Sequence, residues 1–342
     1  MTSDPDHRRV LIIATGGTIG MRPGFAGLAP AGDFAARAEH ALNQLPEARR
    51  QVLPARRFVE YDDPIDSSSA RPAQWYRIAG DIRHHLEQDA NLDGVVVIHG
   101  TDTLAWCGAS LAWQLSALPC PVVMTGAQRP LEAPGSDGPD NLEQALMAAA
   151  LPQLQGVLVA FGGELLDARF ARKWHTADNL AFATPNAEPL GVWRTQWQLK
   201  DGGRCRQPHR APLGAASLPC SPAGTKVVRL TLWPGIEAWQ ARALLQGADG
   251  AVLEAWGSGN LPEDAALAQA LREAIEAGTA IVVISQCPLG ATHLANYATG
   301  RALAATGVID GSDMTPEAAF TRLHWLLASG YHGDTLRQNF HP

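Results

Sequence analysis

The stretch Val10-Leu11-Ile12-Ile13-Ala14-Thr15-Gly16-Gly17-Thr18-Ile19-Gly20 decides the fold. Its first five residues form a short apolar run, which is typical of a strand buried in a parallel sheet. The glycines that follow predict a tight turn, which presents the Thr18 hydroxyl at the carboxyl end of that strand. Backbone N–H groups in such a turn are free to meet a developing anion. The alternative is a plain glycine turn in which Thr18 makes only local hydrogen bonds.

A dinucleotide-binding turn is a second possible interpretation of glycines after a strand. The GxGxxG spacing would require glycine where Thr15 stands. Met21-Arg22-Pro23-Gly24 also breaks the chain where the nucleotide-binding helix would begin. The sequence therefore disfavours a nucleotide site, and we expect no cofactor.

Further apolar runs alternate with helical stretches, which predicts an α/β fold. We expect a larger N-terminal domain with a mostly parallel sheet covered by helices, and a smaller C-terminal α/β domain. The predicted strands are 10–14, 95–99, 122–125, 157–161, 227–232, 250–254 and 280–285. The predicted helices are 72–88, 104–118, 141–151, 236–245, 263–277 and 316–329.

The boundary between the domains is predicted from a change in composition. Residues 199–225 are rich in Gly, Pro, Arg and Ser and show no periodicity, which is typical of a linker. We expect a catalytic domain over residues 1–198, a linker over 199–225 and a second domain over 226–342.

Composition excludes several classes of function. The net charge of -7 and the pI near 5.9 argue against nucleic acid or an anionic membrane as a partner. The five cysteines form no CxxC and the eleven histidines form no HExxH, so we expect neither a disulfide scaffold nor a metal site. The sequence contains no predicted signal peptide or membrane span, so we expect a protein that is not exported.

A second polar turn follows the predicted strand 95–99. His99-Gly100-Thr101-Asp102-Thr103 would emerge at the same sheet edge as Thr18, because parallel strands end on one side. The alternative is that Thr101 or Asp102 only caps the following helix. A threonine nucleophile needs a proton acceptor, and Lys173 is a candidate among only three lysines, although it equally suits a basic surface loop.

The polar segment 61–69 (YDDPIDSSS) precedes the predicted helix 72–88. Its hydroxyls and its acids could grip the carboxylate and ammonium groups of an amino acid. The alternative is that Ser68 or Ser69 caps the helix.

Together these segments resemble the bacterial-type L-asparaginase family, and its cytoplasmic, type I branch most closely. The motifs that carry the resemblance run in order from about Val10 to Gly330. They are TGGTIG at 15–20, DSS at 66–68, HGTDTL at 99–104, TGAQRP at 125–130, SDGPDNL at 136–142, Lys173, GSGN at 257–260, SQC at 285–287 and YATGRALAATGVIDGSDMT at 297–315.

The resemblance implies an amidohydrolase that converts L-asparagine into L-aspartate and ammonia in the cytoplasm, without a cofactor. Thr18 would be the nucleophile that forms an acyl-enzyme, and Thr101, Asp102 and Lys173 would move protons; which threonine attacks first stays open. Asp102 would also bind the α-amino group, and Asp66 and Ser67 the α-carboxylate and neighbouring atoms. The family forms homodimers and homotetramers, in which the smaller domain completes the neighbouring subunit's site. The expected substrate-binding residues are Gly17, Asp66, Ser67, Ser68, Gly100 and Asn260.

One departure from the family pattern concerns the segment after the nucleophile. The family usually has a tyrosine in this mobile lid, but residues 21–30 (MRPGFAGLAP) contain none, and Leu28 takes its place. Either Tyr61 or water substitutes, or turnover is low. The alternatives are therefore an amino-acid-binding or regulatory protein on the same fold, or an amidohydrolase that prefers glutamine or another amide or ester.

Overall fold

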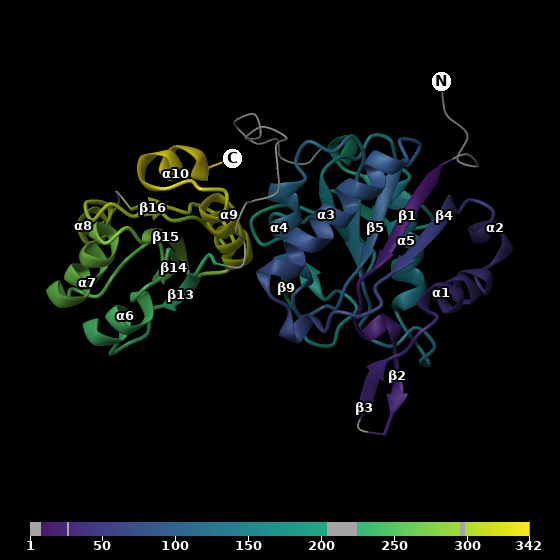
Figure 1. Cartoon of the computed structure of the whole chain (residues 1–342), viewed down its shortest axis with the longest axis horizontal. Coiled ribbons are helices and arrows are strands. Elements are labelled where there is room, and N and C mark those ends of the chain that lie inside the picture. The colour runs from purple at the N-terminus through teal and green to yellow at the C-terminus, as the bar shows by residue number, and fades with distance from the viewer. Residues whose placement is uncertain (1–7, 26, 204–223, 295–297, 342) are drawn as a thin grey trace. The chain divides into compact units, whose positions relative to one another are not determined.

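The computed structural model describes residues 8–25, 27–203, 224–294 and 298–341. The chain divides into two compact units, residues 1–207 and residues 208–342. Within the described residues, each unit has its own mostly or fully parallel sheet with helices on both faces (Figure 1). The predicted α/β class, with a larger N-terminal part and a smaller C-terminal part, is confirmed.

The sheet of the larger unit is mixed. From one edge to the other, its eight described strands are β12 (Trp197–Leu199), β11 (Gly191–Trp193), β8 (Glu164–Asp167), β7 (Val157–Phe161), β6 (Val122–Thr125), β5 (Gly94–Ile98), β1 (Arg9–Ala14) and β4 (Ala55–Glu60). The five strands from β7 to β4 are parallel, and β8, β11 and β12 extend the sheet in antiparallel fashion. Neighbouring β4, β1 and β5 therefore end at one edge, which brings together the loops that follow them.

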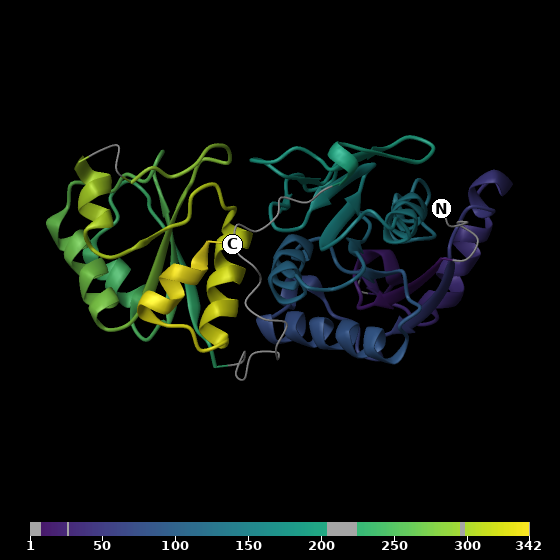
Figure 2. The same ribbon diagram turned by 90° about the horizontal axis from the view of Figure 1, so that it is seen from above.

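Helices cover both faces of this sheet, which explains why its central strands are apolar on both sides. On one face lie α1 (Phe34–Asn43) and α5 (Gly138–Ala149), and on the other lie α3 (Pro72–Gln88) and α4 (Leu104–Gln114) (Figures 1 and 2). Alternate β1 residues Val10, Ile12 and Ala14 join the core beneath α1 and α5. A single-turn helix, α2 (Glu47–Arg50), follows α1.

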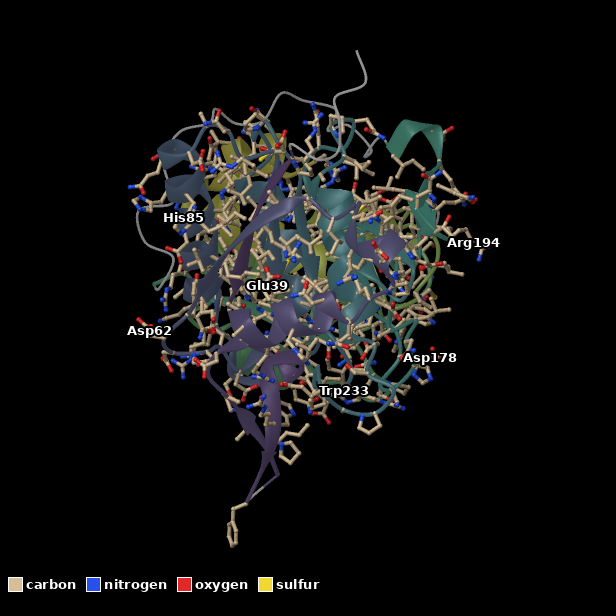
Figure 3. All side chains as sticks on the ribbon, turned by 90° about the vertical axis from the view of Figure 1, so that its right-hand side faces the viewer. Glu39, Asp62, His85, Asp178, Arg194 and Trp233 are labelled. Carbon is tan, nitrogen blue, oxygen red and sulfur yellow. The ribbon has the colours of Figure 1, made fainter. Side chains whose placement is uncertain are left out.

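The segment after the nucleophile candidate is a β-hairpin. β2 (Met21–Gly24) pairs with β3 (Gly27–Pro30), and the hairpin projects from the rest of the larger unit (Figures 1 and 3). Phe25 at its tip is fully exposed, and Leu28 is half exposed. The hairpin therefore presents two apolar side chains at the surface.

The remaining elements of the larger unit are short and shape its loops. They are the 3₁₀ helices η2 (Thr18–Gly20), η3 (Ser67–Ser69) and η4 (Asp201–Gly203), and the antiparallel pair β9 (Arg172–Lys173) and β10 (Phe182–Ala183).

The smaller unit contains a parallel sheet of four described strands, β13 (Val227–Thr231), β14 (Gly250–Ala255), β15 (Ala280–Ser285) and β16 (Ile309–Asp310). One face carries α6 (Ala238–Leu245) and α7 (Ala265–Glu276), and the other carries α9 (Pro316–Ala328) and α10 (Gly333–Phe340). A short helix, α8 (Ala298–Ala304), precedes β16. Asp264 caps α7 by accepting hydrogen bonds from the N–H groups of Ala266 and Leu267.

Most predicted elements occur with shifts of a few residues at their ends. α5 begins at Gly138 rather than at 141, because Pro139 fits the first turn of a helix. α4 ends at Gln114 rather than at 118. Leu199 ends β12, and η4 follows it, so residues 199–203 of the predicted linker are structured. Residues 204–223 lie outside the described part of the chain.

Candidate active site

Three loops at the carboxyl ends of β1, β4 and β5 touch backbone to backbone. A Cβ atom on Gly17 would lie 2.6 Å from the Cα of Gly100, and a Cβ on Gly16 would lie 2.5 Å from the carbonyl oxygen of Ile65. A Cβ on Gly100 would lie 2.3 Å from the Ser67 hydroxyl oxygen. Only glycine permits these approaches, and Gly17 also has a φ of +100°. The motifs after β1 and β5 are thus brought together, as predicted from the parallel sheet, and the loop after β4, a strand that the sequence did not predict, joins them.

The two threonines of the first motif have different environments. Thr15 is buried, and its hydroxyl donates to the carbonyl oxygen of Ile98 at 2.7 Å. Thr18 is partly exposed and begins η2, which closes with a 3.0 Å hydrogen bond from the N–H of Gly20 to the carbonyl of Gly17. Thr15 therefore ties β1 to β5, whereas Thr18 sits in a turn at the surface.

Lys173 reaches the motif that follows β5. Its Nζ donates to Thr101 Oγ1 at 2.8 Å and to Asp102 Oδ1 at 2.7 Å. Thr101 is buried, and the Lys173 side chain is 23% exposed, whereas that of Asp102 is 61% exposed. The alternative that Lys173 is a simple surface residue is wrong, because its amine joins a buried hydroxyl to a carboxylate.

The helix-capping alternative for Thr101 and Asp102 is also wrong. The residue at the N-cap of α4 is Thr103, and its side chain does not cap the helix. The Thr103 hydroxyl instead donates to the carbonyl oxygen of Ser67 at 2.8 Å, which ties the loop after β5 to the loop after β4. Thr101 and Asp102 are thus left to bind Lys173.

Asp66 organises the loop that follows β4. Its carboxylate accepts hydrogen bonds from the Ser68 N–H at 3.0 Å and from the Ser68 and Ser69 hydroxyls. The bond from the Ser68 hydroxyl is the main cause of a lowered Asp66 pKa. An ionised Asp66 repels other carboxylates. We therefore expect Asp66 to shape its loop, rather than to bind the substrate's α-carboxylate directly. Neither serine caps α3, which begins at Pro72 after Arg71.

His99 lies buried beside the loop that follows β5. It is buried, with one ring nitrogen, Nδ1, 2.9 Å from the Gly100 carbonyl oxygen. Because a carbonyl only accepts, Nδ1 carries the proton. Burial lowers the His99 pKa, which keeps the ring neutral. Sequence reasoning assigned this residue no role, since a motif histidine carries no signal of burial.

Tyr61 does not replace the missing lid tyrosine. Its hydroxyl donates to Asp81 of α3, and the Arg77 guanidinium lies 4.1 Å from the centre of its ring. Burial and the Asp81 hydrogen bond raise the Tyr61 pKa well above its usual value. The hydroxyl is therefore held in place and hard to ionise, which leaves the hairpin as the place where this chain departs from the family pattern.

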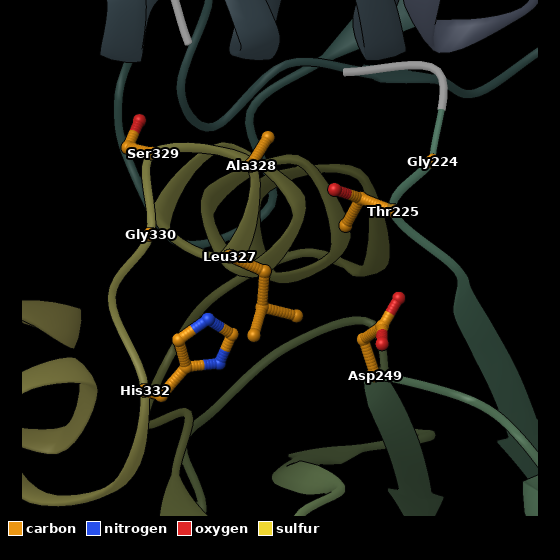
Figure 4. A pocket seen from close by; sticks show the side chains of 8 residues that line it. All are labelled: Gly224, Thr225, Asp249, Leu327, Ala328, Ser329, Gly330 and His332. Atoms are coloured by element: carbon orange, nitrogen blue, oxygen red, sulfur yellow. The ribbon is translucent and has the colours of Figure 1, made fainter. Parts of the chain in front are cut away.

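Asn260 belongs to the smaller unit. It lies in a tight turn in which the N–H of Trp256 donates to the Asn260 carbonyl at 3.1 Å and the Asn260 N–H returns a bond at 2.8 Å. The same unit contains a separate surface cavity of about 430 Å³, shown in Figure 4. Asp249, Leu327 and His332 line it, and it contains no residue of the predicted site.

The described residues contain neither a cluster of metal ligands nor a helix that could span a membrane. Across residues 8–25, 27–203, 224–294 and 298–341, no three His, Cys, Asp or Glu side chains are grouped closely enough to hold a metal ion. In the same part of the chain, every helix is too short or too polar to cross a bilayer.

Comparison with known proteins matches both units to families. Residues 9–202 match the family "Asparaginase, N-terminal", and residues 226–340 match the family "Glutaminase/Asparaginase C-terminal domain". The chain is 36% identical over 337 residues to L-asparaginase 1 of Escherichia coli (strain K12), covering 97% of this chain and 95% of that protein. It is 37% identical over 340 residues to the Homo sapiens 60 kDa lysophospholipase, covering 94% of this chain and 58% of that protein.

A solved structure agrees with these matches. The crystal structure of L-asparaginase I from Vibrio cholerae O1 biovar eltor str. N16961 superimposes with a TM-score of 0.82 at 33% identity, covering 98% of this chain and 97% of that chain. The fold and the matched sequences thus define an amidohydrolase. The chain belongs to the asparaginase family, and its similarity to L-asparaginase 1 indicates the type I branch.

Proposed function

We propose that this protein is a cytoplasmic L-asparaginase, which hydrolyses L-asparagine to L-aspartate and ammonia through a threonine acyl-enzyme. The observation that carries the proposal is the pair of hydrogen bonds from Lys173 Nζ to Thr101 and Asp102, at 2.8 and 2.7 Å. A hydroxyl, a carboxylate and an amine in direct contact form a path along which a proton moves without leaving the site.

In the proposed reaction the Thr18 oxygen attacks the carboxamide carbon of asparagine. The Thr18 proton passes by way of the Thr101–Lys173 pair to the departing nitrogen, which leaves as ammonia. Backbone N–H groups near Thr18 and Thr101 stabilise the oxyanion. Water then attacks the resulting ester, aspartate leaves, and the Thr18 hydroxyl regains a proton.

The carboxylate at position 102 suits the substrate's α-ammonium group. Lys173 occupies Oδ1, and the 61% exposure of the side chain gives a second donor access to it. Ser67, whose side chain packs against Gly100, is the proposed contact for the α-carboxylate, together with N–H groups of its loop. Gly17 and Gly100 keep the floor of the site free of side chains, and Asn260 of a neighbouring subunit in a homo-oligomer completes it.

Two other functions remain to be distinguished by experiment. The human relative is named a lysophospholipase, so an ester or another amide is a second substrate class for this chain. Exposed Leu28 in place of a hairpin tyrosine favours a binding protein with slow turnover as the third possibility. One extra methylene in a substrate changes the free energy of binding by about 1–3 kcal/mol. The preference between glutamine and asparagine is therefore determined by measuring kcat/KM for each.

The deciding experiment measures ammonia release from asparagine by wild type, Thr18→Ala and Thr18→Ser. We expect hydrolysis by wild type, residual hydrolysis by Thr18→Ser, which keeps a hydroxyl, and none by Thr18→Ala with an unchanged circular dichroism spectrum. Calorimetric binding of asparagine by wild type without ammonia release would instead identify a binding protein. Hydrolysis of a lysophospholipid at a higher kcat/KM than asparagine would identify an esterase.

A further inference from the structure

Arg37 joins both ends of the projecting hairpin to one carboxylate. Its side chain is only 7% exposed. Its Nε and Nη2 donate to the two carboxylate oxygens of Glu132 at 2.6 and 2.8 Å. Its Nη1 donates to the carbonyl oxygen of Gly20 at 2.9 Å and to those of Ala31 and Gly32 at 3.3 and 3.4 Å. One guanidinium thus holds the residue before β2 and the residues after β3.

Glu132 and its neighbour hold the same region from the opposite side. Arg22, in the first strand of the hairpin, donates to Glu132 Oε1 at 2.7 Å. The N–H of Leu131 donates to the carbonyl of Ile19 at 3.0 Å. The loop between β6 and α5 therefore fixes the turn before the hairpin as well as the hairpin itself.

These contacts end one residue from the proposed nucleophile. Ile19 and Gly20 form one 3₁₀ turn with Thr18, so fixing their carbonyl groups restricts the direction of the Thr18 side chain. On its other side, this turn is held by the packing of Gly17 against Gly100. The nearly buried guanidinium of Arg37 needs its carboxylate partner, because removing Glu132 leaves an uncompensated charge on Arg37.

We propose that Arg37 and Glu132 form a positioning pair, which fixes the root of the hairpin and thereby aligns Thr18 for attack. The pair touches no reacting atom, so its effect on the reaction is indirect. The consequence for catalysis rests on the proposed amide hydrolysis, whereas the anchoring of the hairpin does not.

The chain provides a matched control in the Arg56–Glu39 pair. Like Arg37 and Glu132, it joins a residue of α1 to another segment, here β4, with two hydrogen bonds, at 2.8 and 2.5 Å, and its Arg side chain is 17% exposed. Glu39 lies on α1, as Figure 3 shows. The contacts of the Arg56 guanidinium within the described residues are with Glu39 and Pro54, away from the hairpin.

The test compares Arg37→Gln and Glu132→Gln with Arg56→Gln. Hydrogen exchange by mass spectrometry follows peptides that cover residues 18–32, and steady-state kinetics follow asparagine hydrolysis. For Arg37→Gln we expect exchange in these peptides to accelerate about tenfold relative to other peptides. We expect kcat to fall about 10- to 100-fold, with a smaller change in KM, because alignment of the nucleophile is lost. Arg56→Gln is expected to leave both measurements near wild type.

Glu132→Gln keeps the Arg37 carbonyl contacts and is expected to show smaller changes in the same direction. If Arg37→Gln fails to fold, Glu132→Gln alone tests whether the pair anchors the hairpin. Wild-type exchange in residues 18–32 of the variants, or acceleration spread evenly over the chain, would overturn the anchoring. A loosened hairpin with an unchanged kcat would overturn the alignment of Thr18. A wild-type protein that releases no ammonia would refute the proposed function, while the exchange data would still test the anchor.

Discussion

At the scale of single residues, the lysines show how composition singles out a candidate side chain. The chain has three, Lys173, Lys200 and Lys226. Lys173 joins Thr101 to Asp102, whereas Lys200 pairs with exposed Glu188 at 2.8 Å. Because lysine is rare in a chain rich in arginine, Lys173 was a candidate from sequence alone. Its contacts could not be predicted, because they join residues more than seventy positions apart.

Replacing Lys173 tests the proposed proton path. We expect Lys173→Met to lower kcat for asparagine by about 10²–10⁴-fold, the usual contribution of a group that transfers protons. Lys200→Met removes an equally charged, exposed side chain and should leave kcat unchanged. Equal losses in the two variants would show that net charge, rather than the proton path, determines the rate.

Leu28 is the second residue whose replacement is informative. It pairs with Pro23 in the hairpin and is half exposed, so a larger side chain fits without a clash. We expect Leu28→Tyr to raise kcat, because it restores a hydroxyl that can pass a proton, and Leu28→Phe to leave it unchanged. Equal kcat values for the two variants would mean that the hydroxyl does not limit this enzyme.

At the scale of elements, buried strands were predictable and polar ones were not. β6, β7 and β15 match their predicted bounds because each is a continuous apolar run. β4 (ARRFVE) was missed because half of its residues are charged. It lies at the edge of the sheet, where charged side chains are common. The hairpin was expected only as a loop, because its two prolines and two glycines argue against strands.

The hairpin anchor predicts a defined response to acid. The Arg37 hydrogen bonds are the main reason why the Glu132 pKa falls from its usual 4.5 to about 2. A carboxyl with a lowered pKa stabilises the anchored state fully above its ordinary pKa, and this contribution is lost as the pH falls from 4.5 through 2. We expect the protection factors of residues 18–32 to be constant between pH 5 and 8 and to fall below about pH 4.5.

Exchange measured over this pH range, corrected for the intrinsic rate, checks the expectation. Glu132→Gln has no carboxyl to titrate and should lack the acid-dependent loss in this segment. A loss of protection that begins above pH 5 in wild type would show that another group controls the hairpin.

At the scale of the whole molecule, the two units have separate cores. Ile12 belongs to the core of the larger unit and Ile281 to that of the smaller one. Ile12→Val and Ile281→Val should each reduce the free energy of unfolding by about 0.5–1.5 kcal/mol. Because the cores are separate, we expect two transitions in urea denaturation, and each substitution should shift only the transition of its own unit. A single transition, in which the double variant loses the sum of the two free-energy changes, would show that the two cores unfold as one.

The sequence predicted which strands share a sheet edge better than it predicted what holds the site together. Thr18 and Thr101 were predicted from their motifs and Lys173 from the scarcity of lysine, and parallel order explains why the two threonines lie at one edge. Arg37 and Glu132 were missed, because an arginine and a glutamate are common on helices and loops. Their pairing is a property of the tertiary structure, because the two residues are 95 positions apart in the sequence.

The scarcity of lysine also determines how this protein can be attached to a support. Lys200 and Lys226 are exposed, whereas the amine of Lys173 is partly buried and engaged by two neighbours. Coupling through an amine-reactive resin therefore links the molecule mainly at Lys200 and Lys226 and spares the amine of Lys173.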